Sequence, residues 1–134
     1  MLKSTLLKAV EAGAGELRRY FNNEDLKISN KEGINNWVTE ADHAAEKAII
    51  DVIKADHPDH FILSEEVGEI VTGSEVKWII DPIDGTINFA SGIPICAVSI
   101  GVEKNGEIVP ASRHADVMVS CGDRLEIVVA VGGG

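Results

Sequence analysis

The hydrophobic pattern of this chain changes near residue 60, and that change limits the folds open to it. Before it, apolar residues recur every three or four positions, which is the period of an amphipathic helix. The first such segment carries Leu2, Leu6, Val10, Leu17 and Phe21. After residue 60 the apolar residues come in short runs, which is typical of strands. The pattern therefore predicts helices first and a sheet second.

A second helix is predicted to begin after Thr39, which stands where an N-cap residue is expected, and to end before His57-Pro58. Its apolar face contains Ala45, Ala48, Ile49, Val52 and Ile53. The polar segment 22–36 between the two helices has no sustained period. It is predicted to be a loop with a short extended piece around Leu26–Ile28.

The strands are indicated by three apolar segments. Phe61–Leu63 and Lys77–Ile80 are short apolar runs, and ICAVSIGVEKNGEIV at 95–109 is typical of two strands joined at Asn105-Gly106. Helices followed by hairpin-forming strands predict an α+β fold. In that fold, two N-terminal helices pack on one face of a largely antiparallel sheet.

Composition restricts the classes of protein that fit. The chain has 134 residues, the size of one domain, and its 45% hydrophobic but only 4% aromatic residues require an aliphatic core. A net charge of −10 argues against nucleic acid or an anionic membrane as the main partner and suits a cation binder. Cys96 and Cys121 are too few for a disulfide framework. The N-terminus has no apolar stretch long enough for a signal peptide or a membrane span, so a cytoplasmic location is expected.

Acidic residues follow two of the predicted strands. Glu65 lies just beyond the first, and Asp81 and Asp84 lie beyond the second within DPIDGT at 81–86. The proline stiffens this turn and the glycine permits close approach of the backbone, so the carboxylates would be aimed into one space. Such oxygen ligands suit Mg²⁺ or Mn²⁺ better than zinc. The residues after Gly85 are predicted to begin a short helix, whose free amides would bind a phosphate.

A purely structural explanation of these residues stays open at this level. Asp-Pro and Asp-Gly are common turn dipeptides, and this chain holds 22 acidic residues. Asp42 falls in the first turn of the second predicted helix, where an acid complements the helix dipole, and shares a face with Glu46 one turn later. His114 and Cys121 have no evident third partner and receive no catalytic role. Residue types and spacing therefore do not choose between a metal site and solvated turns.

One longer stretch is more specific. WIIDPIDGTINF at 78–89 closely resembles the signature W-x-x-D-P-[IL]-D-G-T-x-N-F of the inositol monophosphatase family, and VTEAD at 38–42 and SEE at 64–66 resemble two further motifs of that family in the expected order. The resemblance implies that residues 1–109 are the first half of an αβαβα sugar-phosphatase sandwich. Residues 110–134 do not clearly follow the family and are expected to be a divergent tail that adds further strands.

The resemblance also implies an activity, that of an Mg²⁺-dependent phosphomonoesterase, with Mn²⁺ as a substitute ion. Its substrate would be inositol monophosphate or a related small phosphorylated alcohol, attacked by a metal-activated water. Glu65, Asp81 and the carbonyl of Ile83 would bind the first Mg²⁺, and Asp84 would bind the second.

The same resemblance implies the remaining roles. Asp42 and Thr86 would act with Glu65 in catalysis by orienting and activating the attacking water. Asp84 would contact the substrate, and the amides of Gly85 and Thr86 would hold its phosphate oxygens.

The chain also departs from the family. Ser64 stands where a glycine is usual before the glutamates, and Asn36-Trp37 replaces the commoner Asp-Leu; neither change falls on an expected ligand. The family's second αβ half, with the aspartate of its W-D-x-A-A-G motif, is missing from these residues. We therefore expect one moderate and one weak Mg²⁺ site, slow hydrolysis by the isolated chain, and self-association. The alternative is a truncated, non-catalytic module that binds a metal, a phosphate or a protein partner.

Overall fold

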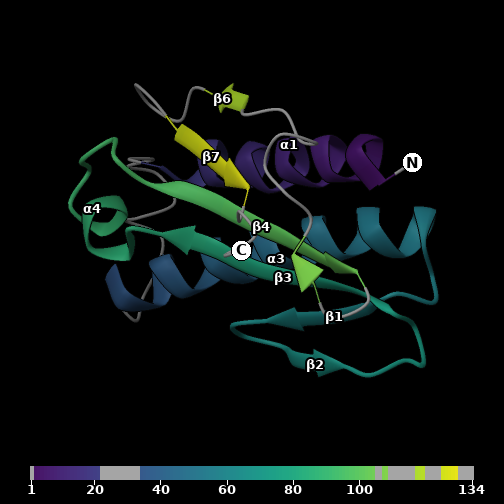
Figure 1. Cartoon of the computed structure of the whole chain (residues 1–134). Helices are drawn as coiled ribbons and strands as arrows, with labels where there is room; N and C mark the ends of the chain where they lie inside the picture. Colours follow the sequence, from purple (N-terminus) through teal and green to yellow (C-terminus); the bar gives the residue numbers. More distant parts are fainter. Residues whose placement is uncertain (1, 22–33, 105–106, 109–116, 120–124, 130–134) are drawn as a thin grey trace.

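The computed structural model describes residues 2–21, 34–104, 107–108, 117–119 and 125–129 (Figure 1). The predicted extended piece at Leu26–Ile28, the turn at Asn105-Gly106, His114 and Cys121 lie outside these residues. None of the described helices combines the length and the apolar character that a membrane crossing requires.

Two long helices, α1 (Leu2–Tyr20) and α3 (Ile34–Asp56), pack side by side against one face of a sheet, as Figure 1 shows. The described strands of the sheet lie in the order β2-β1-β3-β4-β7-β6, with β5 paired to β4. The pairs β1–β3 and β4–β7 are parallel and the other pairs are antiparallel. The strands are β1 (Phe61–Ser64), β2 (Gly68–Ile70), β3 (Val76–Asp84), β4 (Ala97–Lys104), β5 (Glu107–Ile108), β6 (Val117–Val119) and β7 (Leu125–Val129).

The core lies between the helices and the sheet and is mainly aliphatic, with Trp78 and Phe89 as its largest members. The predicted α+β fold is confirmed. The predicted hairpin near residue 105 is confirmed by the antiparallel pairing of β4 with β5, in which Lys104 is opposite Glu107. Strands β6 and β7 come from the tail 110–134, and β7 joins the sheet beside β4.

The start of α3 differs from the prediction. The helix begins at Ile34, so the prediction of an N-cap at Thr39 is wrong and residues 34–36 are not loop. The reason is that Val38 is buried and Ile34 precedes it by one helical turn, so the apolar period extends further back than the polar neighbours suggest. Asp42 therefore lies in the third turn of α3, where a first-turn dipole role does not apply. The predicted end, before His57-Pro58, is confirmed.

Strand β3 also runs further than predicted. It continues through Asp84, so Asp81 lies inside the strand rather than beyond its end. The pairing with β4 shifts between Asp81 and Asp84, where Pro82 has no N–H to donate. An irregularity of this kind keeps the strand paired on both sides of the proline and changes the direction of the side chains between them.

Strand β2 was not predicted. It is short, and its residues Gly68–Ile70 do not form an apolar run. Pairing with β1 across a tight turn supplies the backbone hydrogen bonds that the sequence pattern does not indicate.

Candidate active site

Glu65 and Glu66 lie in the turn between β1 and β2. The register pairs Ser64 with Gly68, so Glu65, Glu66 and Val67 form a three-residue connection. Gly68 closes it with φ of 77°, in the left-handed region that such a hairpin turn requires. Both carboxylates are exposed at this end of the sheet.

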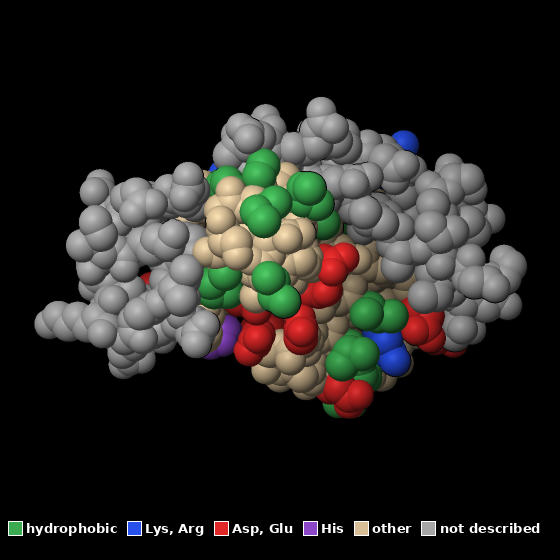
Figure 2. All heavy atoms as spheres, turned by 90° about the vertical axis from the view of Figure 1, so that its left-hand side faces the viewer, with side chains coloured by type: hydrophobic (Ala, Val, Ile, Leu, Met, Phe, Trp, Pro, Cys, Tyr) green, Lys and Arg blue, Asp and Glu red, His purple; other side chains and the backbone are tan. Residues whose placement is uncertain are grey.

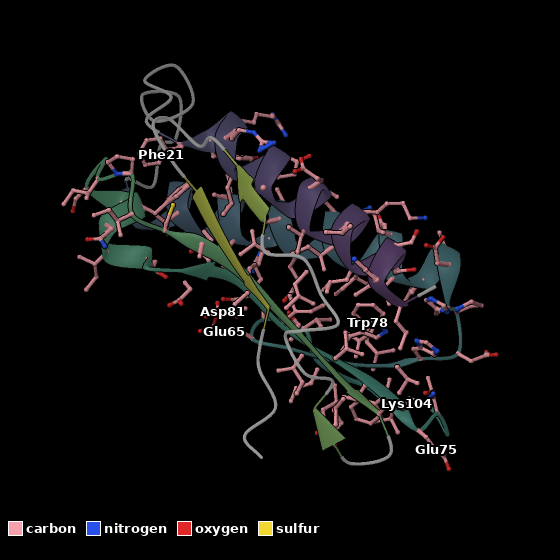
Figure 3. All side chains as sticks on the ribbon, turned by 45° about the horizontal axis from the view of Figure 1, so that its top comes forward. Phe21, Glu65, Glu75, Trp78, Asp81 and Lys104 are labelled. Atoms are coloured by element: carbon pink, nitrogen blue, oxygen red, sulfur yellow. The ribbon has the colours of Figure 1, made fainter. Side chains whose placement is uncertain are left out.

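Asp81 lies beside Glu65 because β1 and β3 are parallel neighbours. Their register pairs Ser64 with Ile80, so the next residue on each chain is Glu65 or Asp81, and Figure 3 shows these two side by side. The pKa of Asp81 is raised from 3.8 to about 7, first by burial, then by a hydrogen bond with Glu65 and by the charges of Glu65 and Asp84; a backbone hydrogen bond opposes the shift. Among the residues that the structure describes, no positive side chain lowers the pKa of Asp81.

Helix α3 brings Asp42 to the same turn. The pKa of Asp42 is raised from 3.8 to about 7, first by burial, then by the charge of Glu66 and a hydrogen bond with it, and then by the charges of Glu65 and Glu46. Glu65 is therefore a common neighbour of Asp42 and Asp81. Three separate elements gather these carboxyl groups.

The crowded carboxyl groups fit a cation in charge and in donor chemistry. One oxygen each of Asp42 and Asp81, Oδ1 in both, is buried without a hydrogen-bond partner in the described part of the chain. A hard cation would satisfy such oxygens and neutralise the neighbouring carboxylate charges that, after burial, raise both pKa values. Among the described residues, however, no three His, Cys, Asp or Glu side chains already form a coordination shell. The residues suit Mg²⁺, but their side chains are not yet arranged around one point.

The segment after β3 forms the predicted short helix, α4 (Thr86–Ala90). It begins after Gly85, whose φ is 91° and where an added Cβ would lie 2.9 Å from the carbonyl oxygen of Ile95. Conformation and space both require glycine there. The Thr86 hydroxyl donates to the carbonyl oxygen of Ile83 at 3.3 Å. The Ile83 carbonyl, expected to bind a metal, and the amides of Gly85 and Thr86, expected to bind phosphate, thus lie together where β3 passes into α4.

A cavity of about 250 Å³ opens next to the carboxylates of Glu65 and Asp81. It is lined by Leu63, Ser64, Glu65, Ile79, Ile80 and Asp81. Its walls are therefore largely aliphatic beside the charged groups. On the face that carries α4, carboxylates gather next to apolar side chains (Figure 2). In α4 and the residues that follow it, Ile87, Ile93 and Ile95 are 82%, 43% and 69% exposed.

Several contacts of the turn were missed from the sequence. The Oε2 atom of Glu46 accepts the Ser64 hydroxyl at 2.7 Å and the amides of Glu66 and Val67 at 3.1 Å each. His43 Nε2 lies 3.5 Å from Glu66 Oε2. The available signal was a glutamate on the otherwise apolar face of α3, at Glu46, which is 7% exposed.

Comparison with known proteins identifies related sequences. The sequence model of the inositol monophosphatase family matches residues 2–114. A Nus factor SuhB from Haemophilus influenzae is 42% identical over 97 residues, which cover 72% of this chain and 36% of that protein. A Nus factor SuhB from Pasteurella multocida is 40% identical over 107 residues, which cover 79% of this chain and 40% of that protein.

Solved structures agree with these matches. The extragenic suppressor protein suhB from Bartonella henselae has a TM-score of 0.69 and 33% identity, over 81% of this chain and 41% of that one. The inositol monophosphatase from an Anabaena (Nostoc) species has a TM-score of 0.64 and 30% identity, over 87% of this chain and 42% of that one. The chain thus spans about two fifths of the length of these relatives.

Proposed function

This chain belongs to the inositol monophosphatase family, and on that premise we propose that it acts as an Mg²⁺-dependent phosphomonoesterase in the cytoplasm. The substrate would be inositol monophosphate or a related small phosphorylated alcohol. The observation that carries the proposal is that Asp42 and Asp81 each have a pKa raised to about 7 and a buried oxygen that lacks a partner in the described residues. Burial, followed by the charges of neighbouring carboxylates, causes both shifts, and pKa shifts of this size are common among functional carboxylates.

The residues divide into ligands and groups that act on water. Glu65, Asp81 and the Ile83 carbonyl would hold one Mg²⁺, and Asp84 would contribute to a second. Bound Mg²⁺, or Mn²⁺ in its place, would supply charge neutralisation of the phosphate and a more acidic water. The charge of Glu65 is one cause of the raised pKa of Asp42. With a pKa of about 7, Asp42 would accept and release a proton near neutral pH, which is what a general base requires.

The connection after β3 would bind the substrate. The amides of Gly85 and Thr86 stand at the start of α4, where amide groups have no partner within the helix, and would hold phosphate oxygens. Asp84 is exposed next to them and would contact the alcohol. The Thr86 hydroxyl, which now donates to the Ile83 carbonyl, would help Asp42 to orient the water.

Release of inorganic phosphate from inositol monophosphates, with Mg²⁺ and then with Mn²⁺, tests this function directly. Asp42→Asn and Asp81→Asn are the informative variants because both remove charge without changing shape. Hydrolysis that depends on the divalent ion and is lost in both variants is expected. Hydrolysis that survives a chelator would refute the proposal.

A second candidate is a non-catalytic interaction protein on the same scaffold. It is favoured by two observations: relatives about 40% identical are named Nus factor SuhB, and Ile87 and Ile95 are mostly exposed beside the site. These relatives give no support to the expectation that nucleic acid is excluded as a partner. The partner we propose for the apolar patch is a second copy of this chain, since neighbouring apolar side chains on a surface favour association. Sedimentation of the chain and of Ile87→Ser, with phosphate release measured in parallel, separates the two candidates.

A further inference from the structure

Glu46 is a buried acidic residue to which the proposed reaction assigns no part. Its side chain projects from α3 one turn after Asp42, and the residue is 7% exposed. A buried carboxylate is costly unless hydrogen bonds or a cation compensate its charge. Within the described part of the chain, Glu46 makes no ion pair with a Lys, Arg or His. Hydrogen bonds must therefore offset its burial.

Three donors converge on one oxygen of this carboxylate. The Ser64 hydroxyl lies 2.7 Å from Oε2, and the backbone amides of Glu66 and Val67 lie 3.1 Å from the same atom. All three donors belong to the hairpin of β1 and β2, whereas the acceptor belongs to α3. Hydrogen bonds from backbone amides to a carboxylate are about twice as strong as those between neutral groups.

These bonds hold the backbone on both sides of Glu65. Ser64 is the last residue of β1 and precedes Glu65, and Glu66 follows it. The amides of a three-residue hairpin turn have few partners in the ladder, so without Glu46 they would turn to water. Electrostatics alone does not favour Glu46 at this place, because its charge adds to the negative charges around Asp42. Its contribution is the fixed geometry of the turn.

We propose that Glu46 is a positioning residue: its carboxylate fixes the turn 64–67 so that Glu65 is held beside Asp81 before any cation binds. The proposal rests on the proposed function, because positioning matters only if Glu65 is a ligand. Ser64 takes part through its hydroxyl, which a glycine at that position would lack. Preorganised ligands need no ordering when the ion arrives, and loss of the groups that orient ligands typically weakens metal binding by about 10- to 100-fold.

The test uses the full chain and four variants. Glu46→Ala removes the acceptor, Glu46→Gln keeps a neutral acceptor of the same shape, and Ser64→Ala removes one donor. Glu69→Gln is the matched control, because it removes the same charge from an exposed position of the same hairpin. Two quantities are measured: hydrogen exchange of the amides of Glu66 and Val67 in chelator, and the Mg²⁺ dissociation constant by calorimetry at a temperature where each variant is folded.

Glu46→Ala should expose the two amides to exchange and weaken Mg²⁺ binding by about 10- to 100-fold. Ser64→Ala should weaken it by about fivefold, because it removes only one of the three donors, and Glu46→Gln should fall between wild type and Glu46→Ala. If Glu46→Ala does not fold, amide exchange and the Mg²⁺ dissociation constant are compared among the other variants. Both should be higher in Glu46→Gln and Ser64→Ala than in Glu69→Gln.

Two results would overturn the proposal. One is exchange at Glu66 and Val67 that is the same in Glu46→Gln, Ser64→Ala and Glu69→Gln. The other is faster exchange with Mg²⁺ affinity unchanged from the control, which would make Glu46 a folding residue only. A third result would separate the two proposals. If the wild-type chain binds no Mg²⁺ but the Glu46 variants still exchange the amides of Glu66 and Val67 faster, the proposed function is refuted, and the conclusion that Glu46 fixes the turn is supported.

Discussion

Helix α3 and strand β3 connect two polar regions with opposite electrostatics. In the site region, around Asp42, Glu65 and Asp81, the pKa values of Asp42 and Asp81 are raised to about 7, first by burial and then by neighbouring carboxylates. At the C-terminal end of α3, the pKa of Asp56 is held below its ordinary 3.8, first by a hydrogen bond from Lys8 and then by one from the Thr5 hydroxyl at 2.7 Å. The pKa of an aspartate is thus raised at Asp42 and lowered at Asp56, two positions on the same helix.

We call the surroundings of Asp56, His57, His60 and Trp78 the distal region. Its aromatic side chains also have partners within the chain. Trp78 is fully buried, and its Nε1 donates to Nδ1 of His60 at 2.9 Å, so that nitrogen of His60 carries no proton. The ring of His57 stacks on His60 with the centroids 4.3 Å apart. Burial, followed by the charge of His57, lowers the pKa of His60. These polar groups of the distal region have internal partners, whereas no positive group in the described residues lowers the pKa of Asp42 or Asp81. This difference supports the proposal that the site binds an external cation.

The sharpest test of this contrast makes one substitution at both places on α3. Asp42→Asn should lower phosphate release by about 10²- to 10⁴-fold, since a general base is lost, and should leave most Mg²⁺ binding intact. Asp56→Asn should leave turnover unchanged at a temperature where the variant is folded. Steady-state phosphate release and calorimetric Mg²⁺ titration are the measurements. Normal hydrolysis by Asp42→Asn would remove Asp42 from the mechanism.

The stability of the metal-free chain should fall as the pH rises from about 4 to about 7. Asp42 and Asp81 have folded-state pKa values of about 7 against 3.8 in the unfolded chain, so the folded state binds more protons in this window. Both groups are partly exposed, so after discounting for solvent the loss is on the order of 2 kcal/mol per group. Mg²⁺ should raise the melting midpoint more at about pH 8 than at about pH 4.

Thermal melts in chelator and in Mg²⁺, between about pH 4 and pH 8, measure the pH dependence of stability and the effect of the cation on it. Asp81→Asn should reduce the pH dependence in chelator, because it removes one of the two groups whose pKa is raised in the folded chain. A chelated chain whose midpoint is flat between about pH 4 and pH 7 would mean that folding does not raise these two pKa values. A midpoint shifted by zinc but not by Mg²⁺ would contradict a hard-cation site.

Backbone strain at the site offers a smaller test. Gly85→Ala should destabilise the fold by about 1 to 3 kcal/mol, because its φ is 91° and the new Cβ would meet the Ile95 carbonyl oxygen. Gly73→Ala is the matched control, since a Cβ there meets nothing within 4 Å. Denaturant unfolding measures both. Equal midpoints for the two variants would show that the connection before α4 relaxes freely.

The smallest effect is expected in the distal region, with the opposite pH dependence. Because the pKa of His60 is lowered in the folded state, its contribution is present above the unfolded value of 6.5 and is lost as the pH falls below it. His60→Asn should reduce this loss at acid pH, at a cost of at most about 1 kcal/mol at neutral pH. Melts between about pH 5 and pH 7 check the prediction. A wild-type chain with no such loss would mean that burial and the charge of His57 do not lower the pKa of His60.

Local patterns predicted the regular elements and failed where tertiary pairing extended them. The period of α1 and the short helix after Gly85 follow from neighbouring residues alone, and both are confirmed. The predicted start of α3, residue 40, is six residues late because Thr39 is a good capping residue, whereas the observed helix begins at Ile34 and buries Val38. Strand β2 was missed because its pairing with β1, rather than its composition, makes it a strand.

By itself, the sequence determined the chemistry available to the site: three family motifs that carry hard oxygen donors, and a glycine where the connection to α4 turns. Its residues could not show which of those donors meet, because Asp42, Glu65 and Asp81 come from a helix, a hairpin turn and a strand. The tertiary structure decided that Glu65 is a neighbour of both other carboxyl groups, that the pKa values of Asp42 and Asp81 are both raised, and that Glu46 accepts hydrogen bonds from the turn 64–67. The physical reason is that charge repulsion and burial depend on distances through space, which residue spacing along the chain does not contain.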